Sequence, residues 1–202
     1  DAAPVEDLIA LTDEVGALLI IDEAHALGVV GPRGGGLVAA AGQAGAEHVV
    51  VTGTLSKAFG SQGGAVLASP DVREHLVNTA RPFIYDTGLA PAAAGAALAA
   101  LGVLADHPEL LDRLGATAAR LAEACGVPAP AGAVMSVLMP GPHEAVATVE
   151  RARAHGIRIG CFRPPSTPDG SSRLRLTAHA DLGDADLERA GSVLDTLVPD
   201  HG

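Results

Sequence analysis

The chain has 202 residues, of which 48% are apolar, and a formal net charge of −11 at pH 7. This length and apolar content can form a core in one large domain or in two smaller ones. The negative charge and the absence of a basic run argue against nucleic acid as the main partner, and no apolar stretch reaches the roughly 20 residues of a membrane span.

The first half of the chain alternates between predicted helices and strands, and this alternation indicates an α/β sheet. The expected strands are residues 17–21, 48–51 and 65–68, and the expected helices are 4–16, a short one after a glycine-rich loop, one that starts at Ser69, and 91–105. The strand at 17–21 is continuously apolar, as strands buried on both faces of parallel sheets are. The alanine-rich helix 91–105 is also expected to be buried.

The second half has a different pattern. It predicts helix 108–125, strand 133–139, helix 142–155, strands 157–162 and 173–178, and helix 184–198. This order is typical of a small α+β domain, so we expect a large domain at 1–105 and a small one at 106–202. The first has about three strands, whereas open parallel sheets usually have five or six. Because the chain also starts at Asp1 without a methionine, we expect the large domain to be incomplete.

The two cysteines, Cys125 and Cys161, lack the spacing of metal ligands and lie within a predicted helix and a predicted strand. They indicate buried thiols in a reducing compartment rather than a disulfide. The sequence therefore predicts a cytoplasmic protein with no metal site.

Lys57 is the only lysine among 13 basic residues. It follows the β-branched strand at 48–51 and the small-residue turn Gly53-Thr54-Leu55-Ser56. Arginine cannot replace a primary amine that must lose its proton to react, because the guanidinium stays protonated. The position is consistent with a chemical role for Lys57, or with a single lysine that remains by chance where all other Lys and Arg positions are arginine.

Asp22 and His25 come directly after the strand at 17–21, where open α/β sheets place ligands. Taken singly, each could be a turn or core residue. Asp22-Glu23-Ala24-His25 also matches the magnesium-binding box of helicase-type ATPases. That function needs a phosphate loop ending in Gly-Lys-Ser/Thr, whereas Lys57 lies between Ser56 and Ala58, so such a loop would have to lie upstream of Asp1.

An aspartate, a histidine and a lysine at successive strand ends fit pyridoxal phosphate. This cofactor needs an amine for its aldehyde, a carboxylate for its ring nitrogen, and donors for its phenolic oxygen and phosphate. The combination favours chemistry over chance at Lys57.

Two segments carry a family resemblance, 22–31 (DEAHALGVVG) and 53–60 (GTLSKAFG), the latter followed by Gly63-Gly64. They resemble the α-oxoamine synthases, which are fold-type I pyridoxal-phosphate enzymes that condense an amino acid with an acyl-CoA. The segments 81–87 (RPFIYDT), 163–168 (RPPSTP) and 170–176 (GSSRLRL) continue the match in order. The resemblance covers the C-terminal half of a family member, so it implies the partial cofactor-binding domain at 1–105, with a mainly parallel sheet, and the small domain at 106–202.

The resemblance also implies roles for single residues. Lys57 would be the Schiff-base lysine, Asp22 the partner of the ring nitrogen, and His25 the partner of the phenolic oxygen. Thr54 would bind the phosphate, and Thr87 the phosphate of a neighbouring subunit in a homodimer, although Asp86 departs from the family's usual Ser or Thr. The substrate-binding candidates are Arg175 for the amino-acid carboxylate, Ser166, and Arg163, which could also be structural.

Substrate choice depends on the Arg163-Pro164-Pro165 segment, which resembles the 8-amino-7-oxononanoate synthase branch. This implies condensation of L-alanine with a pimeloyl thioester in biotin synthesis. The alternatives are the glycine C-acetyltransferase or 5-aminolevulinate synthase type, a catalytically incompetent fragment of such an enzyme, and the ATPase.

Overall fold

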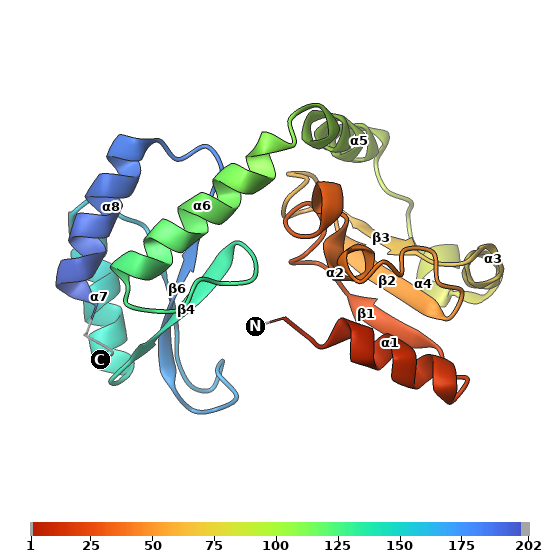
Figure 1. Cartoon of the computed structure of the whole chain (residues 1–202), viewed down its shortest axis with the longest axis horizontal. Coiled ribbons are helices and arrows are strands. Elements are labelled where there is room, and N and C mark those ends of the chain that lie inside the picture. Colours follow the sequence, from red (N-terminus) through yellow and green to blue (C-terminus); the bar gives the residue numbers. More distant parts are fainter. Residues whose placement is uncertain (1, 199–202) are drawn as a thin grey trace. The chain divides into compact units, whose positions relative to one another are not determined.

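The computed structural model describes residues 2–198, so Asp1 and residues 199–202 of the two expected domains lie outside the described residues. The described chain divides into two compact units, 2–111 and 112–198 (Figure 1). The division falls in the first turn of helix α6 (Glu109–Ala124). The expected domain boundary after residue 105 stays a prediction.

The first unit contains a three-stranded sheet in the order β1-β2-β3. Its strands are β1 (Leu19–Asp22), β2 (Val49–Thr54) and β3 (Gly64–Leu67). β1 and β2 run parallel, with Leu19 opposite Val49 and Asp22 opposite Thr52. β3 runs antiparallel to β2, which the sequence did not predict. Only residues 55–63 connect the two strands, and a parallel crossover needs a dozen residues or more.

Helices α1 and α2 pack on one face of this sheet. The helices of the unit are α1 (Val5–Glu14), the 3₁₀ turn η1 (Pro32–Gly34), α2 (Gly36–Ala40), α3 (Pro70–Thr79), α4 (Arg81–Ile84) and α5 (Pro91–Asp106). The core joins Val5 and Ile9 of α1, Val38 of α2, and Val49 and Val51 of β2. Strand alternation places these β2 side chains on the helix-covered face.

On the other face of the sheet, the two edge strands are uncovered in the described chain, whereas Val50 of the central strand is buried. Ile20 is 65% exposed and Val66 54% exposed, and both share this face with Asp22 because their strand partners Val50 and Thr52 lie on it. The expectation that strand 17–21 is buried on both faces is therefore wrong for this chain. Helix α5 is likewise mostly exposed: Ala97 is its only buried residue, and Leu98 is 70% exposed.

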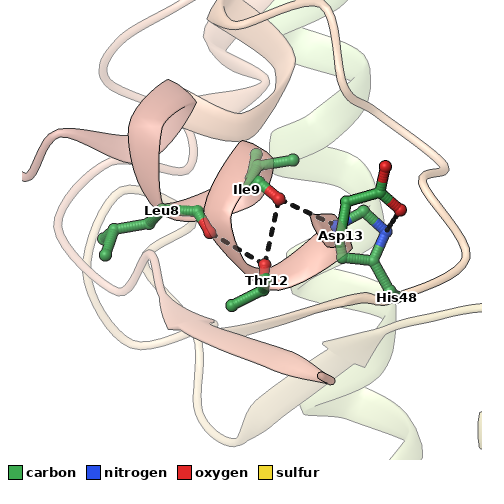
Figure 2. Close-up of polar contacts among 5 residues, drawn as sticks. All are labelled: Leu8, Ile9, Thr12, Asp13 and His48. Carbon is green, nitrogen blue, oxygen red and sulfur yellow. Dashed lines mark hydrogen bonds and ion pairs between the residues drawn. The ribbon is translucent and has the colours of Figure 1, made fainter. Parts of the chain in front are cut away.

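His48 connects α1 to the sheet (Figure 2). Its Nε2 lies 3.2 Å from the carbonyl oxygen of Ile9, and its Nδ1 lies 3.8 Å from Asp13 Oδ1. The carbonyl oxygen of His48 accepts a hydrogen bond from the N–H of Leu19, 2.8 Å away, at the start of β1. In the last turns of α1, Thr12 Oγ1 donates to the carbonyl oxygens of Leu8 and Ile9. One residue, His48, thus links α1 through its side chain and β1 through its backbone, directly before β2 begins.

The second unit is an antiparallel sheet with helices on one face. Its elements are the rest of α6, β4 (Val134–Met139), α7 (Pro142–Ala154), β5 (Gly160–Phe162), β6 (Ser172–Thr177) and α8 (Asp184–Leu197), and the strand order is β4-β6-β5. Val137, Leu174 and Leu194 are completely buried in its core. Arg120 of α6 pairs with Asp184 at the start of α8, with 2.7 Å between Nη1 and Oδ1. This order of elements agrees with the small α+β domain expected from the sequence.

Among residues 2–198, no helix is both long and apolar enough to cross a membrane. In the same part of the chain, no three His, Cys, Asp or Glu side chains are grouped so that they could bind a metal ion.

Candidate functional site at the strand ends

The carboxyl end of β1 presents Asp22 and His25 to solvent. Asp22 is exposed, and its Oδ1 accepts a hydrogen bond of 2.8 Å from the N–H of Ala24, which starts a turn. The carbonyl oxygen of Glu23 accepts from the N–H groups of Ala26 and Leu27, at 2.9 and 3.0 Å, and closes that turn. His25 is exposed within it. The local hydrogen bonds therefore fix the position of both candidate residues relative to the strand.

Lys57 lies on a compact turn after β2. The N–H of Leu55 donates to the carbonyl oxygen of Gly63 at 2.9 Å, and the N–H of Gly60 donates to that of Lys57 at 3.0 Å. Gly60 and Gly63 have φ values of 57° and 105°, which favour glycine over other residues. The Lys57 side chain is exposed. The small residues of the motif thus let the chain turn tightly around the lysine.

The Thr54 hydroxyl is held within the same turn. Thr54 Oγ1 lies 2.7 Å from Ser56 Oγ, donates to the carbonyl oxygen of Gly63 at 3.3 Å, and accepts from the N–H of Ser56 at 3.2 Å. These contacts orient a hydroxyl group at the end of β2, one turn before Lys57.

The structure brings four predicted site residues to one edge of the sheet. Because β1 and β2 are parallel neighbours, their carboxyl ends meet at the same edge. Asp22 is paired with Thr52, and Thr54 follows two residues further along the same face. A carboxylate, an imidazole, a hydroxyl and an amine are therefore displayed from two adjacent strand ends.

Thr87 belongs to a third segment of the first unit rather than to the two strand ends. It is exposed in the segment between α4 and α5, and its N–H donates to Asp86 Oδ1 at 2.8 Å. No hydrogen bond or ion pair joins Thr87 to Asp22, Thr54 or Lys57 within residues 2–198. Its predicted role on a neighbouring subunit stays a prediction.

The three substrate-binding candidates belong to the second unit. Arg163 and Ser166 are exposed on the loop between β5 and β6, where the N–H of Ser166 donates to the carbonyl oxygen of Arg163 at 2.8 Å. Arg175 lies in β6 opposite Gly160 of β5 and Ser136 of β4. By strand alternation, Arg175 lies on the face of the small sheet that points away from its core.

The two arginines of β6 have different neighbours. Arg173 Nη2 donates to Asp169 Oδ2 at 2.6 Å, so this guanidinium is already paired. The Ser171 hydroxyl, the Arg173 guanidinium and the Ser171 N–H hold the pKa of Asp169 well below its usual range. Arg175 has no carboxylate partner among the described residues, and its Cζ lies 5.7 Å from the centre of the Phe162 ring. Arg175 is thus the arginine of this strand that can still bind an anion.

Glu23 is the residue that the sequence analysis missed. It is 1% exposed, and its two carboxylate oxygens accept hydrogen bonds from the N–H groups of Leu37 and Val38. Strand alternation is the signal that could have found it, because Asp22 and Glu23 must point to opposite faces. A carboxylate directed inward ahead of a glycine-rich loop and a helix start indicates a cap.

Comparisons with known proteins match nearly the whole chain. The family model described as "Aminotransferase class I and II" matches residues 1–194. The chain belongs to this family. The chain is 55% identical over 193 residues to an 8-amino-7-oxononanoate synthase of Mycobacterium sp. (strain JLS), covering 95% of this chain and 50% of that protein. It is 53% identical over 203 residues to the synthase of Mycolicibacterium smegmatis, covering 98% of this chain and 52% of that protein.

Solved structures agree with this assignment. Serine palmitoyltransferase of Sphingomonas wittichii superposes with a TM-score of 0.89 at 27% identity, over 98% of this chain and 51% of that one. The 8-amino-7-oxononanoate synthase of Francisella tularensis superposes with a TM-score of 0.79 at 26% identity, over 94% and 57%. The predicted resemblance and the fold-type I class are confirmed, and the ATPase interpretation is left without support. The chain spans about half the length of the curated relatives that it matches.

Proposed function

We propose that the whole protein containing this chain condenses L-alanine with a pimeloyl thioester, carried by CoA or a carrier protein, in biotin synthesis. The products are 8-amino-7-oxononanoate, CO₂ and the free thiol. The choice of substrates is supported by the names of the relatives at 53–55% identity, which are all 8-amino-7-oxononanoate synthases.

The observation that carries this proposal is the arrangement of Asp22 and Lys57 at one edge of the sheet of the first unit. The groups displayed there fit pyridoxal phosphate: a carboxylate for a ring nitrogen, an amine for an aldehyde, and the Thr54 hydroxyl for a phosphate. A structurally similar serine palmitoyltransferase was solved with this cofactor bound.

Each residue of the first unit then has a distinct task. When bound, pyridoxal phosphate supplies an electron sink for negative charge at the amino-acid α-carbon. The Asp22 carboxylate stabilises a proton on the ring nitrogen, and His25 donates to the phenolic oxygen. Thr54 binds the phosphate, with Thr87 doing so for the neighbouring subunit. The Lys57 amine would hold the cofactor and, once the amine of alanine has replaced it there, would take the proton from the α-carbon of alanine.

The second unit provides the substrate contacts. The Arg175 guanidinium, already oriented by the Phe162 ring, pairs with the carboxylate of alanine through two N–H donors. Ser166 contacts the substrate from the loop, and Arg163 faces the acyl substrate. The new carbon–carbon bond joins the alanine α-carbon to the thioester carbonyl carbon, the thiol leaves, and the alanine carboxyl group departs as CO₂.

The assembly and the location follow from the same function. A homodimer is proposed because the resemblance implies active sites at a subunit interface. A cytoplasmic location agrees with Cys125 and Cys161, which are both free thiols.

The test is a substrate panel on the whole protein loaded with pyridoxal phosphate. L-alanine and glycine are each offered with pimeloyl-, acetyl- and succinyl-CoA, and free thiol is measured with Lys57→Ala as the blank. The proposal expects the highest kcat/KM for alanine with the pimeloyl thioester. A preference for glycine with the acetyl or succinyl donor would favour the other two synthase types, and no turnover with any pair would favour an incompetent protein.

A further inference from the structure

Glu23 is the one charged side chain among the buried residues of the described chain, and the proposed reaction does not use it. It is 1% exposed, whereas Asp22 before it is exposed. Burying an ionised carboxylate is unfavourable unless its oxygens are hydrogen-bonded. The contacts of this carboxylate therefore indicate what it does.

Both oxygens bind the first turn of α2. Glu23 Oε2 accepts from the N–H of Leu37 at 2.7 Å, and Oε1 accepts from the N–H of Val38 at 2.8 Å. These N–H groups have no partner within the helix, because the first four N–H groups of any helix lack one. Hydrogen bonds to an ionised acceptor are stronger than neutral ones. The side chain thus ties the end of β1 to the start of α2.

The glycine-rich loop is folded around this carboxylate. Gly36 has a φ of 89°, and a Cβ at that position would lie 1.9 Å from Glu23 Oε2. The N–H of Gly36 donates to the carbonyl oxygen of Val30 at 2.9 Å, and a Cβ on Gly31 would lie 2.2 Å from the carbonyl oxygen of Gly36. Gly36 thus leaves room for the carboxylate, and Gly31 leaves room for the backbone of Gly36.

The backbone of Glu23 lies between Asp22 and His25, the two candidate cofactor-binding residues, and holds both in place. Its N–H donates to the carbonyl oxygen of Thr52 at 2.8 Å, which extends the pairing of β1 with β2. Its carbonyl oxygen closes the turn that contains His25. These hydrogen bonds couple the position of Glu23 to the positions of Asp22 and His25.

We propose that Glu23 is a positioning residue: by binding the first turn of α2, its buried carboxylate fixes the turn that presents Asp22 and His25 to the cofactor. Glu23 itself contacts neither cofactor nor substrate. This inference depends on the proposed function, in which Asp22 and His25 contact pyridoxal phosphate.

The test compares Glu23→Gln with wild type in the whole protein. Glutamine keeps the shape and one acceptor oxygen, but its NH₂ group faces an N–H donor and cannot accept from it. We expect the Kd for pyridoxal phosphate to rise about tenfold, because cofactor binding must then also order the turn bearing Asp22 and His25 that the carboxylate no longer holds in place. We also expect the absorbance spectrum of the bound cofactor to change in the same direction as in Asp22→Asn, because both variants weaken the contact with the ring nitrogen.

Ser69→Ala is the matched control. Ser69 Oγ accepts from the N–H of Val72 and caps α3, so this variant also removes a helix cap from the first unit, but away from the strand end. It is expected to lower stability and to leave the cofactor spectrum and Kd unchanged. If the cofactor Kd and spectrum change in Glu23→Gln but not in Ser69→Ala, the change reflects positioning and not a general loss of stability.

A double-mutant cycle gives a second, independent result. Gly36→Ala should unfold or strongly destabilise the protein when Glu23 is present, because the new Cβ overlaps the carboxylate. In the Glu23→Ala background the three atoms nearest to that Cβ are removed and the backbone strain of a positive φ remains, so the effect of the same substitution on the urea midpoint should be smaller.

The outcomes separate the two proposals. If wild type takes up no pyridoxal phosphate, the proposed function and this inference both fail. If wild type binds the cofactor but Glu23→Gln has the wild-type spectrum and Kd, or matches Ser69→Ala in both, the inference alone is overturned. Equal effects of Gly36→Ala in both backgrounds would also overturn it.

Discussion

A single amine, Lys57, is displayed on a turn that small residues make possible. In the whole protein, borohydride treatment in the presence of pyridoxal phosphate should attach the cofactor irreversibly to Lys57, because only an unprotonated amine condenses with its aldehyde. Peptide mapping identifies the labelled residue. Lys57→Arg is the control, since it keeps the charge without a reactive amine. A visible cofactor band and turnover in that variant would show that Lys57 is not the attachment site.

Loss of the Asp22 carboxylate is expected to lower kcat more than it weakens cofactor binding. Asp22→Asn removes the charge that stabilises a proton on the ring nitrogen and leaves Lys57 and Thr54 in place. We expect kcat to fall by about 10²–10³-fold, the usual effect of losing such an electrostatic contact, with a much smaller change in cofactor Kd. Steady-state kinetics and cofactor titration measure the two quantities. Near-native turnover would contradict the role of Asp22.

Arg175 and Arg173 offer a matched pair on one strand. Arg175→Lys should raise the KM for alanine by about tenfold or more, because lysine cannot form the two parallel hydrogen bonds of a guanidinium. Arg173→Lys keeps a cation beside Asp169 and should change KM little. Initial rates at varied alanine concentration distinguish the variants. Equal changes in the KM for alanine in the two variants would contradict the assignment of the alanine carboxylate to Arg175.

At the scale of elements, the end of α6 has a predicted pH response. Burial raises the pKa of the Cys125 thiol to about 11 from its ordinary value of 9.0. The folded state keeps the proton in that interval while the unfolded chain loses it, so stability should be unaffected below pH 9 and fall between pH 9 and 11. The fall is at most about 3 kcal/mol, at 1.36 kcal/mol for each pH unit. Urea unfolding of wild type and Cys125→Ala across this range tests it, and parallel curves for the two would contradict it.

Sequence patterns predicted the elements well where local signals are strong. Helix α8 was expected at 184–198 and spans Asp184–Leu197, and the Gly156 stop after α7 has a φ of 77°. The direction of β3 was not predicted, although the short connection between β2 and β3 already indicates an antiparallel pair. The four-residue helix α4 is too short to show a helical period in the sequence, so no helix is predicted there.

The predictions that failed concern burial. Strand β1 and helix α5 have apolar sequences typical of buried elements, but Ile20 and Leu98 are exposed in this chain. Composition indicates that an element is suited to burial, whereas actual burial depends on what surrounds it. For the candidate site, the sequence identified Asp22, His25, Thr54 and Lys57 but not Glu23, whose partners lie 14 and 15 residues away.

At the scale of the whole molecule, the 202 residues alone should not catalyse the condensation at a rate typical of enzymes. One face of the first sheet leaves Ile20 and Val66 exposed, and the chain spans half the length of its relatives. The exposed apolar surface and the two free sheet edges should also make the purified chain prone to aggregation.

Thiol release from a pimeloyl thioester measures this prediction, with the chain mixed with pyridoxal phosphate and L-alanine. Lys57→Ala is the control for non-enzymatic hydrolysis. Turnover by the chain that disappears in this variant would show that the site is complete without further sequence.

The hydrogen bonds from Glu23 to Leu37 and Val38 also bear on the order of folding. They close a loop of only 14 to 15 residues, and the entropy lost on closing a loop grows with its length. Contacts between residues close in sequence form faster than distant ones. The turn bearing Asp22 and His25 is thus expected to be among the first parts of the sheet to take its final form. During synthesis it can do so while residues 112–198 are still untranslated, because the chain emerges from its N-terminal side.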